Sequence, residues 1–275
     1  MIFIDGVELP FVEQTTRPEG SSAGTDNGAF NVAAIAGGVA PDGDLVTPID
    51  SPTADDPKLL ATDVRTIIDQ AIVRANVTRA AIRLPLGQRA KMVIAVTDLA
   101  GNILGLHRMV DSTIFSIDVA VAKARNVTYF SGSAVAAEDQ ITGLPSGTAI
   151  TNRTIGFGAQ PFFPSGIDGT SPGPFRGIYD FDTANPCTQG RQPASANQNG
   201  IVFFPGSSPL YKPNAAGQMV LVGGLGVSGD GVDQDDYVTA GGLVGYEPPE
   251  TIRADQISID NVRLPFFKFP RNPED

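Results

Sequence analysis

The chain has 275 residues, 41% of them hydrophobic. This is enough for one large domain or two small ones that fold without disulfide bonds or structural metal ions. Its 30 Asp and Glu outnumber 19 Lys and Arg, and the net charge of −11 argues against nucleic acid as a partner, because that binding draws on clustered cations. The single cysteine, Cys187, excludes an intrachain disulfide and a cysteine-rich zinc site.

No run of the sequence approaches the ~18 apolar residues of a membrane span, so we predict none. The N-terminus, MIFIDGVELP, lacks the basic region and the long apolar core of a secretory signal. The compartment therefore stays open between the cytoplasm and export after removal of a signal that this sequence does not contain.

The first sixty residues are rich in Gly, Pro, Asp, Ser and Thr, with only short apolar pieces between them. Such a segment cannot build a core by itself. We expect residues 1–55 to form an extended arm over the domain or over a neighbouring subunit, and residues 56–246 to form a single domain.

A helix is predicted over residues 62–80, because apolar side chains recur there at helical spacing: Val64, Ile67, Ile68, Ala71, Ile72 and Ala75. Next, MVIAVTD and ILGLHRM read as two strands, and the turn LAGN joins them in a hairpin. Asp98 precedes that turn, where its carboxylate can accept backbone N–H groups. A second helix is expected over 113–130, with Ser112 or Thr113 as its N-cap.

Residues 131–200 carry many Pro and Gly and predict an irregular insertion with one short helix near TAITNRTIGFGAQ. Regular structure resumes with a strand at IVFFPG, a turn at YKPNAAG, a strand at QMVLVGGLGVSG and a helix over 233–245. We expect the acidic first turn of that helix to be solvated. Residues 247–275 form a C-terminal arm whose LPFFKF cluster docks on a groove.

The elements thus follow the order helix, strand, strand, helix, insertion, strand, strand, helix. Two hairpins forming one antiparallel sheet with helices packed on it give an α+β architecture.

The segment GLGVSG matches the G-x-G-x-x-G pattern of dinucleotide-binding loops. The pattern also requires a second parallel strand ending in an acidic residue, and EPPETI at 247–252 does not supply it. We interpret the glycines instead as small residues at the end of the last strand that let backbone segments approach closely.

Two blocks, in their order, carry a family resemblance. VTDLAGNILGLHRMVDSTIFSIDVAVAKARNVTYF contains R-M-x-D and S-x-x-x-A-x-x-K-A, and GGLGVSGDGVDQDDYVTAGG contains G-x-x-G-V-S-G-x-x-x-x-Q-D. Both are similar to the haem-binding GlcG/HbpS family, which includes a C-terminal domain of some PduO-type adenosyltransferases. The resemblance implies a five-stranded antiparallel sheet flanked by helices, assembly into homo-oligomers, and haem binding, degradation or sensing. The two arms and the insertion at 131–200 are additions to the family pattern.

His107, the only histidine, is the candidate iron ligand; it shares a strand face with Gly105 and Met109, while Leu106 and Arg108 point to the other side. Met109 or Met219 would be a softer ligand. Arg108 and Lys123 are candidate anchors for a propionate or another carboxylate, although Arg108 can equally pair with Asp111 or Asp118. Aromatic residues that could flank a macrocycle, or simply pack in the core and arms, are Tyr129, Phe130, Phe162, Phe163, Phe203 and Phe204.

The sequence therefore predicts a small-molecule-binding protein, with haem as the possible cofactor, in a pocket beside the first hairpin, the 113–130 helix and the glycine segment. The ligand-binding residues expected there are His107, Arg108, Met109, Lys123, Gly226, Ser228 and Gly229. Two alternatives stay open, an enzyme acting on a small organic acid and a structural oligomerisation module. No Ser-His-Asp set or paired carboxylates support a particular reaction.

Overall fold

The computed structural model describes residues 2–4, 7–9, 41–164, 166–186, 188–193 and 198–275. Most of the expected N-terminal arm, and Cys187, lie outside these residues. The helices are α1 (Ala61–Val77), α2 (Ser116–Phe130), α3 (Asn152–Gly158), α4 (Arg176–Ala184) and α5 (Val232–Gly242), with short 3-10 turns η2 (Ala137–Asp139), η3 (Glu250–Ile252) and η4 (Ala254–Gln256). The strands are β1 (Ile2–Ile4), β2 (Val7–Leu9), β3 (Gly43–Val46), β4 (Met92–Asp98), β5 (Ile103–Arg108), β6 (Ser207–Pro213), β7 (Met219–Gly229), β8 (Ser258–Ile259) and β9 (Val262–Arg263).

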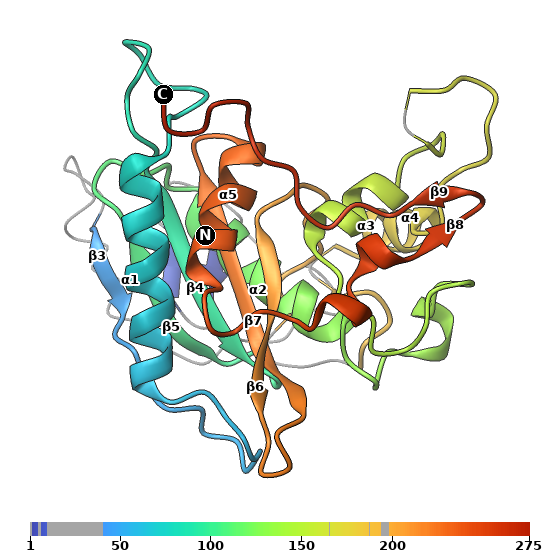
Figure 1. Ribbon diagram of the computed structural model, residues 1–275, viewed down its shortest axis with the longest axis horizontal. Helices are drawn as coiled ribbons and strands as arrows, with labels where there is room; N and C mark the ends of the chain where they lie inside the picture. Colours follow the sequence, from blue (N-terminus) through green and yellow to red (C-terminus); the bar gives the residue numbers. More distant parts are fainter. Residues whose placement is uncertain (1, 5–6, 10–40, 165, 187, 194–197) are drawn as a thin grey trace.

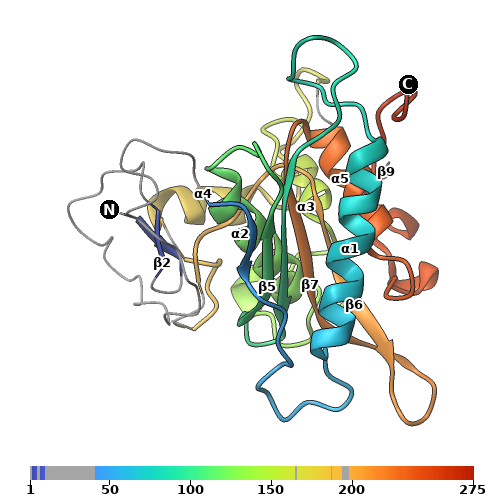
Figure 2. The same ribbon diagram turned by 90° about the vertical axis from the view of Figure 1, so that its left-hand side faces the viewer.

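Five strands form the central antiparallel sheet, in the order β3-β5-β4-β7-β6. Helices α1 and α5 cover one face and α2 covers the other, which Figure 2 shows with the sheet nearly edge-on. One apolar cluster, including Ile67, Ile94 and Val227, fills the space under α1 and α5. A second, including Val93, Leu106 and Val121, lies under α2. The predicted five-stranded α+β fold is confirmed.

The insertion and the C-terminal arm lie side by side beyond the β6 edge of the sheet (Figure 1). They share a third apolar cluster, in which Leu264 and Phe266 of the LPFFKF segment are buried together with Phe130, Ile150 and Phe175. The expected docking of LPFFKF is therefore confirmed, in a cluster that the C-terminal arm, the insertion and the end of α2 build together.

Helix α1, the β4–β5 hairpin, β7 and α5 lie where the sequence pattern predicts them. Asp98 has the predicted role in the hairpin turn, since its Oδ1 accepts N–H groups from Ala100 and Asn102 at 3.0 and 2.9 Å. The short helix expected near residues 148–160 is α3, and Thr151 caps it.

The predicted N-cap of the second helix is wrong, because α2 begins at Ser116 and its N-cap, Phe115, makes no side-chain capping bond. Both predicted capping hydroxyls have other partners. Ser112 Oγ donates to the carbonyl of Lys91 at 3.3 Å, and Thr113 Oγ1 lies 2.6 Å from Ser116 Oγ.

The strand predicted at IVFFPG is also wrong, since β6 begins one residue after it, at Ser207. Backbone groups of the IVFFPG segment are taken by side chains instead: Asn126 accepts from the Val202 N–H at 2.9 Å, and Asp182 accepts from the Ile201 N–H at 3.2 Å. Gly206 then turns the chain with a φ of +113°. Because β6 is an edge strand, it tolerates Pro209.

The sequence pattern gave no signal for β3 or α4. Strand β3 is only four residues long, inside a stretch rich in Gly, Pro and Asp, and it forms one edge of the sheet beside β5. Helix α4 is nine residues long and lies in the insertion. The Pro and Gly residues near it favoured an irregular segment in the sequence analysis.

Candidate functional site

His107 lies on β5, between strands β3 and β4. It is paired in register with Ile94 of β4 and with Asp44 of β3. Its Nδ1 is 2.8 Å from Asp44 Oδ1, and Arg65 of α1 donates to the other oxygen of the same carboxylate. The His107 side chain is 18% exposed. Sequence reasoning found the histidine but missed Asp44 and Arg65, since neither lies in a motif.

Asp44 determines which ring nitrogen of His107 carries a proton. Burial opposes ionisation, but hydrogen bonds from Arg65 and His107 outweigh it and hold the pKa of Asp44 below its usual range. An ionised carboxylate only accepts hydrogen bonds, so Nδ1 of His107 is the donor. The Nε2 atom of the neutral ring is left as an acceptor or a metal ligand.

The sheet divides the predicted binding residues between its two faces. Met109 shares the face of α1 with His107, as the strand alternation predicts, and is buried in the core there, where its sulfur lies 3.4 Å from the Met92 nitrogen. Gly229 packs closely on Met92 as well. Gly226 and Ser228 face α2, and Ser228 Oγ donates to Ser116 Oγ at 3.1 Å.

Arg108 is buried on the α2 face and bonds to backbone carbonyls. Its guanidinium donates to the carbonyl of Pro41 at 3.0 Å and to that of Ser112. Burial lowers the pKa of Arg108, against the attraction of nearby Asp42 and Asp111. Its side chain also lines an open groove of about 440 Å³ with Arg83 and Asp230.

Lys123 is fully buried and forms an internal ion pair. Its Nζ donates to Asp235 Oδ2 at 2.9 Å and to the carbonyl of Val227 at 2.7 Å, and it lies 5.0 Å from the ring centre of Phe204. Burial lowers the pKa of Lys123 and raises the pKa of Asp235 to about 6, each against the attraction of the other. The lysine comes from α2 and the aspartate from α5, so the pair joins the two faces of the sheet.

The expectation of a solvated acidic start for the last helix is wrong. Asp230, Asp235 and Asp236 are 1%, 2% and 0% exposed. Each of these acids has a cation as partner. Asp235 pairs with Lys123, Asp236 binds Arg153 at 2.5 Å, and Asp230 binds Arg83. These acids are buried because cations from three other segments meet the start of α5, and no spacing in the sequence reveals those cations.

The glycine segment is a packing surface for helix α2. A side-chain carbon on Gly224 or Gly226 would overlap the carbonyl oxygen of Ala124 or Ala120 in α2. This confirms the close-approach interpretation of the sequence, although the whole GGLGVSG run lies inside β7 and the turn comes after it, at Gly231.

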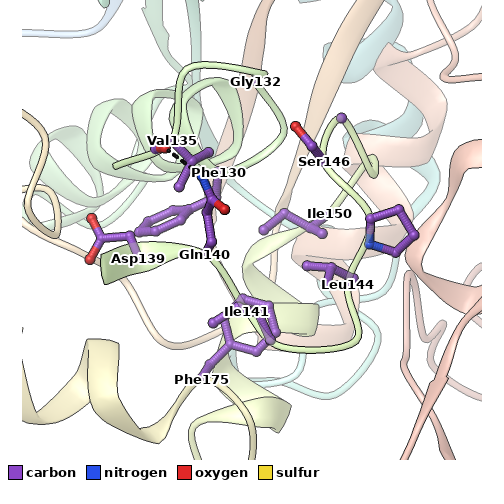
Figure 3. Close-up of a pocket in the computed structure, with 12 residues that line it drawn as sticks. Phe130, Gly132, Val135, Asp139, Gln140, Ile141, Leu144, Ser146, Ile150 and Phe175 are labelled. Atoms are coloured by element: carbon purple, nitrogen blue, oxygen red, sulfur yellow. Dashed lines mark hydrogen bonds between the residues drawn. The ribbon is translucent and has the colours of Figure 1, made fainter. Parts of the chain in front are cut away.

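Two adjoining cavities lie at the far end of α2, where they share Gly132 and Gly147. The smaller, about 90 Å³, is shown in Figure 3, with Ile141, Leu144, Ile150 and Phe175 turned toward one another. The larger is about 500 Å³, within the range typical of ligand sites, and Met219 is among its lining residues. His107 lines neither cavity.

The predicted aromatic set is spread over several places. Tyr129, Phe130 and Phe163 are buried in the third apolar cluster, while Phe162 and Phe204 are about 40% exposed. Phe203 stacks edge-on against Tyr179. Core and arm packing thus accounts for most of these rings.

Within the described residues, no group of three or more His, Cys, Asp or Glu side chains is placed to hold a metal ion. Over the same part of the chain, no helix has both the length and the apolar character needed to cross a membrane.

The fold and these contacts define an α+β protein with one five-stranded antiparallel sheet between helices and, on the strand next to its β3 edge, a histidine that contacts a carboxylate. The model of a family described as haem degrading protein HbpS-like matches residues 68–243. The chain therefore belongs to the HbpS-like family.

Three solved structures are similar to the chain. A PduOC:heme complex is 21% identical, with 68% of this chain and 94% of that chain covered and a TM-score of 0.41. Klebsiella pneumoniae protein ORFY is 17% identical, with 70% and 94% covered and a TM-score of 0.43. A double mutant of Streptomyces reticuli HbpS is 15% identical, with 70% and 90% covered and a TM-score of 0.40. No curated protein matches the chain.

Proposed function

We propose that this protein binds haem and that His107 is its iron ligand. Membership of a family described as haem-degrading supports haem as the ligand. The observation that carries the choice of residue is the 2.8 Å contact between Nδ1 of His107 and Asp44. A metal-ligating histidine usually donates its other ring N–H to a carboxylate or a carbonyl, which fixes the ring and raises its basicity.

The residues around His107 fit this role. Asp44 holds the Nδ1 proton, so Nε2 is the ligating atom. Arg65, whose side chain is 37% exposed, supplies a cation beside the pair for a propionate. When bound, haem would supply an iron centre for redox chemistry or oxygen chemistry. The role of the protein is to hold the imidazole ring of His107 in one orientation through its contact with Asp44.

Neither methionine proposed as a softer ligand belongs in the same site. Met109 is buried in the core under α1. Met219 lies eight positions from Val227 along β7, and Val227 is opposite Ile94, the partner of His107. At about 3.3 Å per residue the separation is about 26 Å. We therefore assign the single protein ligand to His107.

Titration with hemin tests the proposal. Because His107 is the only histidine, a histidine-type Soret shift can come from no other residue of the chain. We expect His107→Ala to abolish that shift and added imidazole to restore it. Asp44→Ala should weaken binding about tenfold or more, as loss of a supporting carboxylate commonly does. Asp69→Ala, at the exposed end of the Arg65 pair, is the control and should bind normally. A His107→Ala protein with an unchanged Soret band would exclude His107.

The alternative of an enzyme acting on an organic acid finds less support. It relied on Arg108 and Lys123 as carboxylate anchors, and both are buried and bonded to the chain itself. Assembly of identical copies is a separate proposal, which concerns the exposed surface of the whole molecule.

A further inference from the structure

The larger cavity beside α2 is built from parts of the chain that lie far apart in the sequence. Leu99 comes from the β4–β5 turn, Met219 and Leu221 from the start of β7, and Tyr211 from β6. Ala134 belongs to the insertion and Ile252 to the C-terminal arm. The segments that exceed the family pattern thus close a space of about 500 Å³ against the family core.

Tyr211 brings an unused hydrogen-bonding group to this cavity. Its side chain lines the cavity although the residue is only 4% exposed. Among the described residues its hydroxyl has no hydrogen-bond partner, and burial raises the pKa of the phenol to about 12. The hydroxyl of a tyrosine in a cavity wall can donate to an acceptor on a molecule bound there. The other tyrosine in the wall, Tyr129, already donates to Asp139 at 2.8 Å.

The lining also restricts the charge of a ligand. The described residues that form the wall are apolar side chains, glycines, hydroxyls and one amide, with no Asp, Glu, Lys, Arg or His among them. A charged group there would lose part of its hydration without gaining a counter-ion, which is unfavourable. An apolar body loses nothing by entering.

We propose that this cavity is a second binding site, for an uncharged and largely apolar small molecule that carries a hydrogen-bond acceptor such as a ketone or quinone oxygen. The phenol of Tyr211 donates to that oxygen, and Met219 and Leu221 contact the apolar body. This site is separate from His107. Leu221 is paired with Tyr211 and lies six positions from Val227, so about 20 Å of strand separates it from the partner of Ile94.

Three matched naphthalene probes test the assignment by calorimetric titration. 2-Acetylnaphthalene carries the acceptor, 2-ethylnaphthalene lacks it, and 2-naphthoate replaces it with a charge. We expect 2-acetylnaphthalene to bind the wild-type protein more tightly than either of the others. Tyr211→Phe should weaken 2-acetylnaphthalene about fivefold, the value of one hydrogen bond, and leave 2-ethylnaphthalene unchanged.

Two further variants guard against a general loss of structure. Ala134→Phe, at an exposed position of the wall, should fill the cavity and abolish binding of both neutral probes in a folded protein. Tyr179→Phe, on the surface of α4, should change nothing. His107→Ala should also leave both neutral probes bound, which separates this site from the haem proposal. Failure of 2-acetylnaphthalene to bind, or equal binding by Tyr211→Phe, would overturn the assignment.

Discussion

Lys123 is a fully buried cation whose counter-charge, Asp235, lies 112 positions further along the chain. Two charges taken out of water gain little net stability from each other, yet removing one of them leaves the other uncompensated. The pair therefore matters for which segments meet more than for overall stability. It holds α2, β7 and α5 in one arrangement, with the Val227 carbonyl as the third contact of the lysine.

Replacing the lysine alone should be strongly destabilising. We expect Lys123→Met to lower the free energy of unfolding by about 3–5 kcal/mol, because Asp235 then stays buried without a cation. The double variant Lys123→Met, Asp235→Leu should recover most of that loss. Chemical denaturation measures both. Lys268→Met removes the exposed pair with Asp233 and should cost less than about 1 kcal/mol. A double variant no more stable than the single would refute the account.

At the scale of elements, the contact between α2 and β7 determines how closely the helix lies on the sheet. Gly224 and Gly226 leave no side chain between the strand and the helix, so backbone atoms of the two elements touch. Ala120 and Ala124 are the matching small residues of α2, and they are buried. The glycine motif is thus a packing surface, and it explains why a literal dinucleotide pattern occurs in a chain without a Rossmann arrangement.

Gly226→Ala should push α2 away from the sheet. We expect a loss of about 3 kcal/mol or more in the free energy of unfolding, since overpacking against backbone cannot relax by side-chain rotation. Gly177→Ala is the matched control. It lies in α4 with nothing within 4 Å of an added carbon, and alanine should stabilise that helix by up to about 1 kcal/mol. Thermal unfolding followed by circular dichroism compares the two, and equal effects would argue against close packing at Gly226.

At the scale of the whole molecule, a group of exposed apolar side chains stands out on two loops. Ile82, Leu84 and Leu86 are 64%, 82% and 84% exposed, and Val110 is 64% exposed on the neighbouring loop. Arg83 ties the loops together through Asp111 at 2.5 Å. Exposed apolar side chains gathered on neighbouring loops are typical of an interface. We propose that copies of the chain associate through this surface, as the family resemblance led us to expect.

Light scattering tests the association. Leu84→Glu together with Leu86→Glu should reduce the molar mass of the assembly, because burying two carboxylates in an apolar interface is unfavourable. The control, Val73→Glu, is 67% exposed on α1 and should leave the mass unchanged. A wild-type protein that is monomeric across the concentration range, or an assembly that survives the double variant, would contradict the proposal.

The sequence by itself determined the elements with clear periodicity and the identity of the chemically distinctive residues. The helical spacing of Val64, Ile67 and Ile68 and the hairpin around LAGN depend on contacts within a few residues, so pattern alone was enough. The alternation along β5 also separated His107 from Arg108 correctly, because neighbours on a strand point to opposite faces. The strand at IVFFPG failed for the opposite reason, since long-range side-chain bonds overrode its β propensity.

Only the tertiary structure decided which of those residues work together. Asp44 beside His107, Asp235 beside Lys123 and the unpaired Tyr211 hydroxyl in a cavity all depend on segments far apart in the sequence. Hydrogen bonds, ion pairs and burial act over a few ångströms of space, whatever the distance along the chain. A residue type can therefore be read from the sequence, but its partner, its charge state and its access to a ligand follow from the folded arrangement.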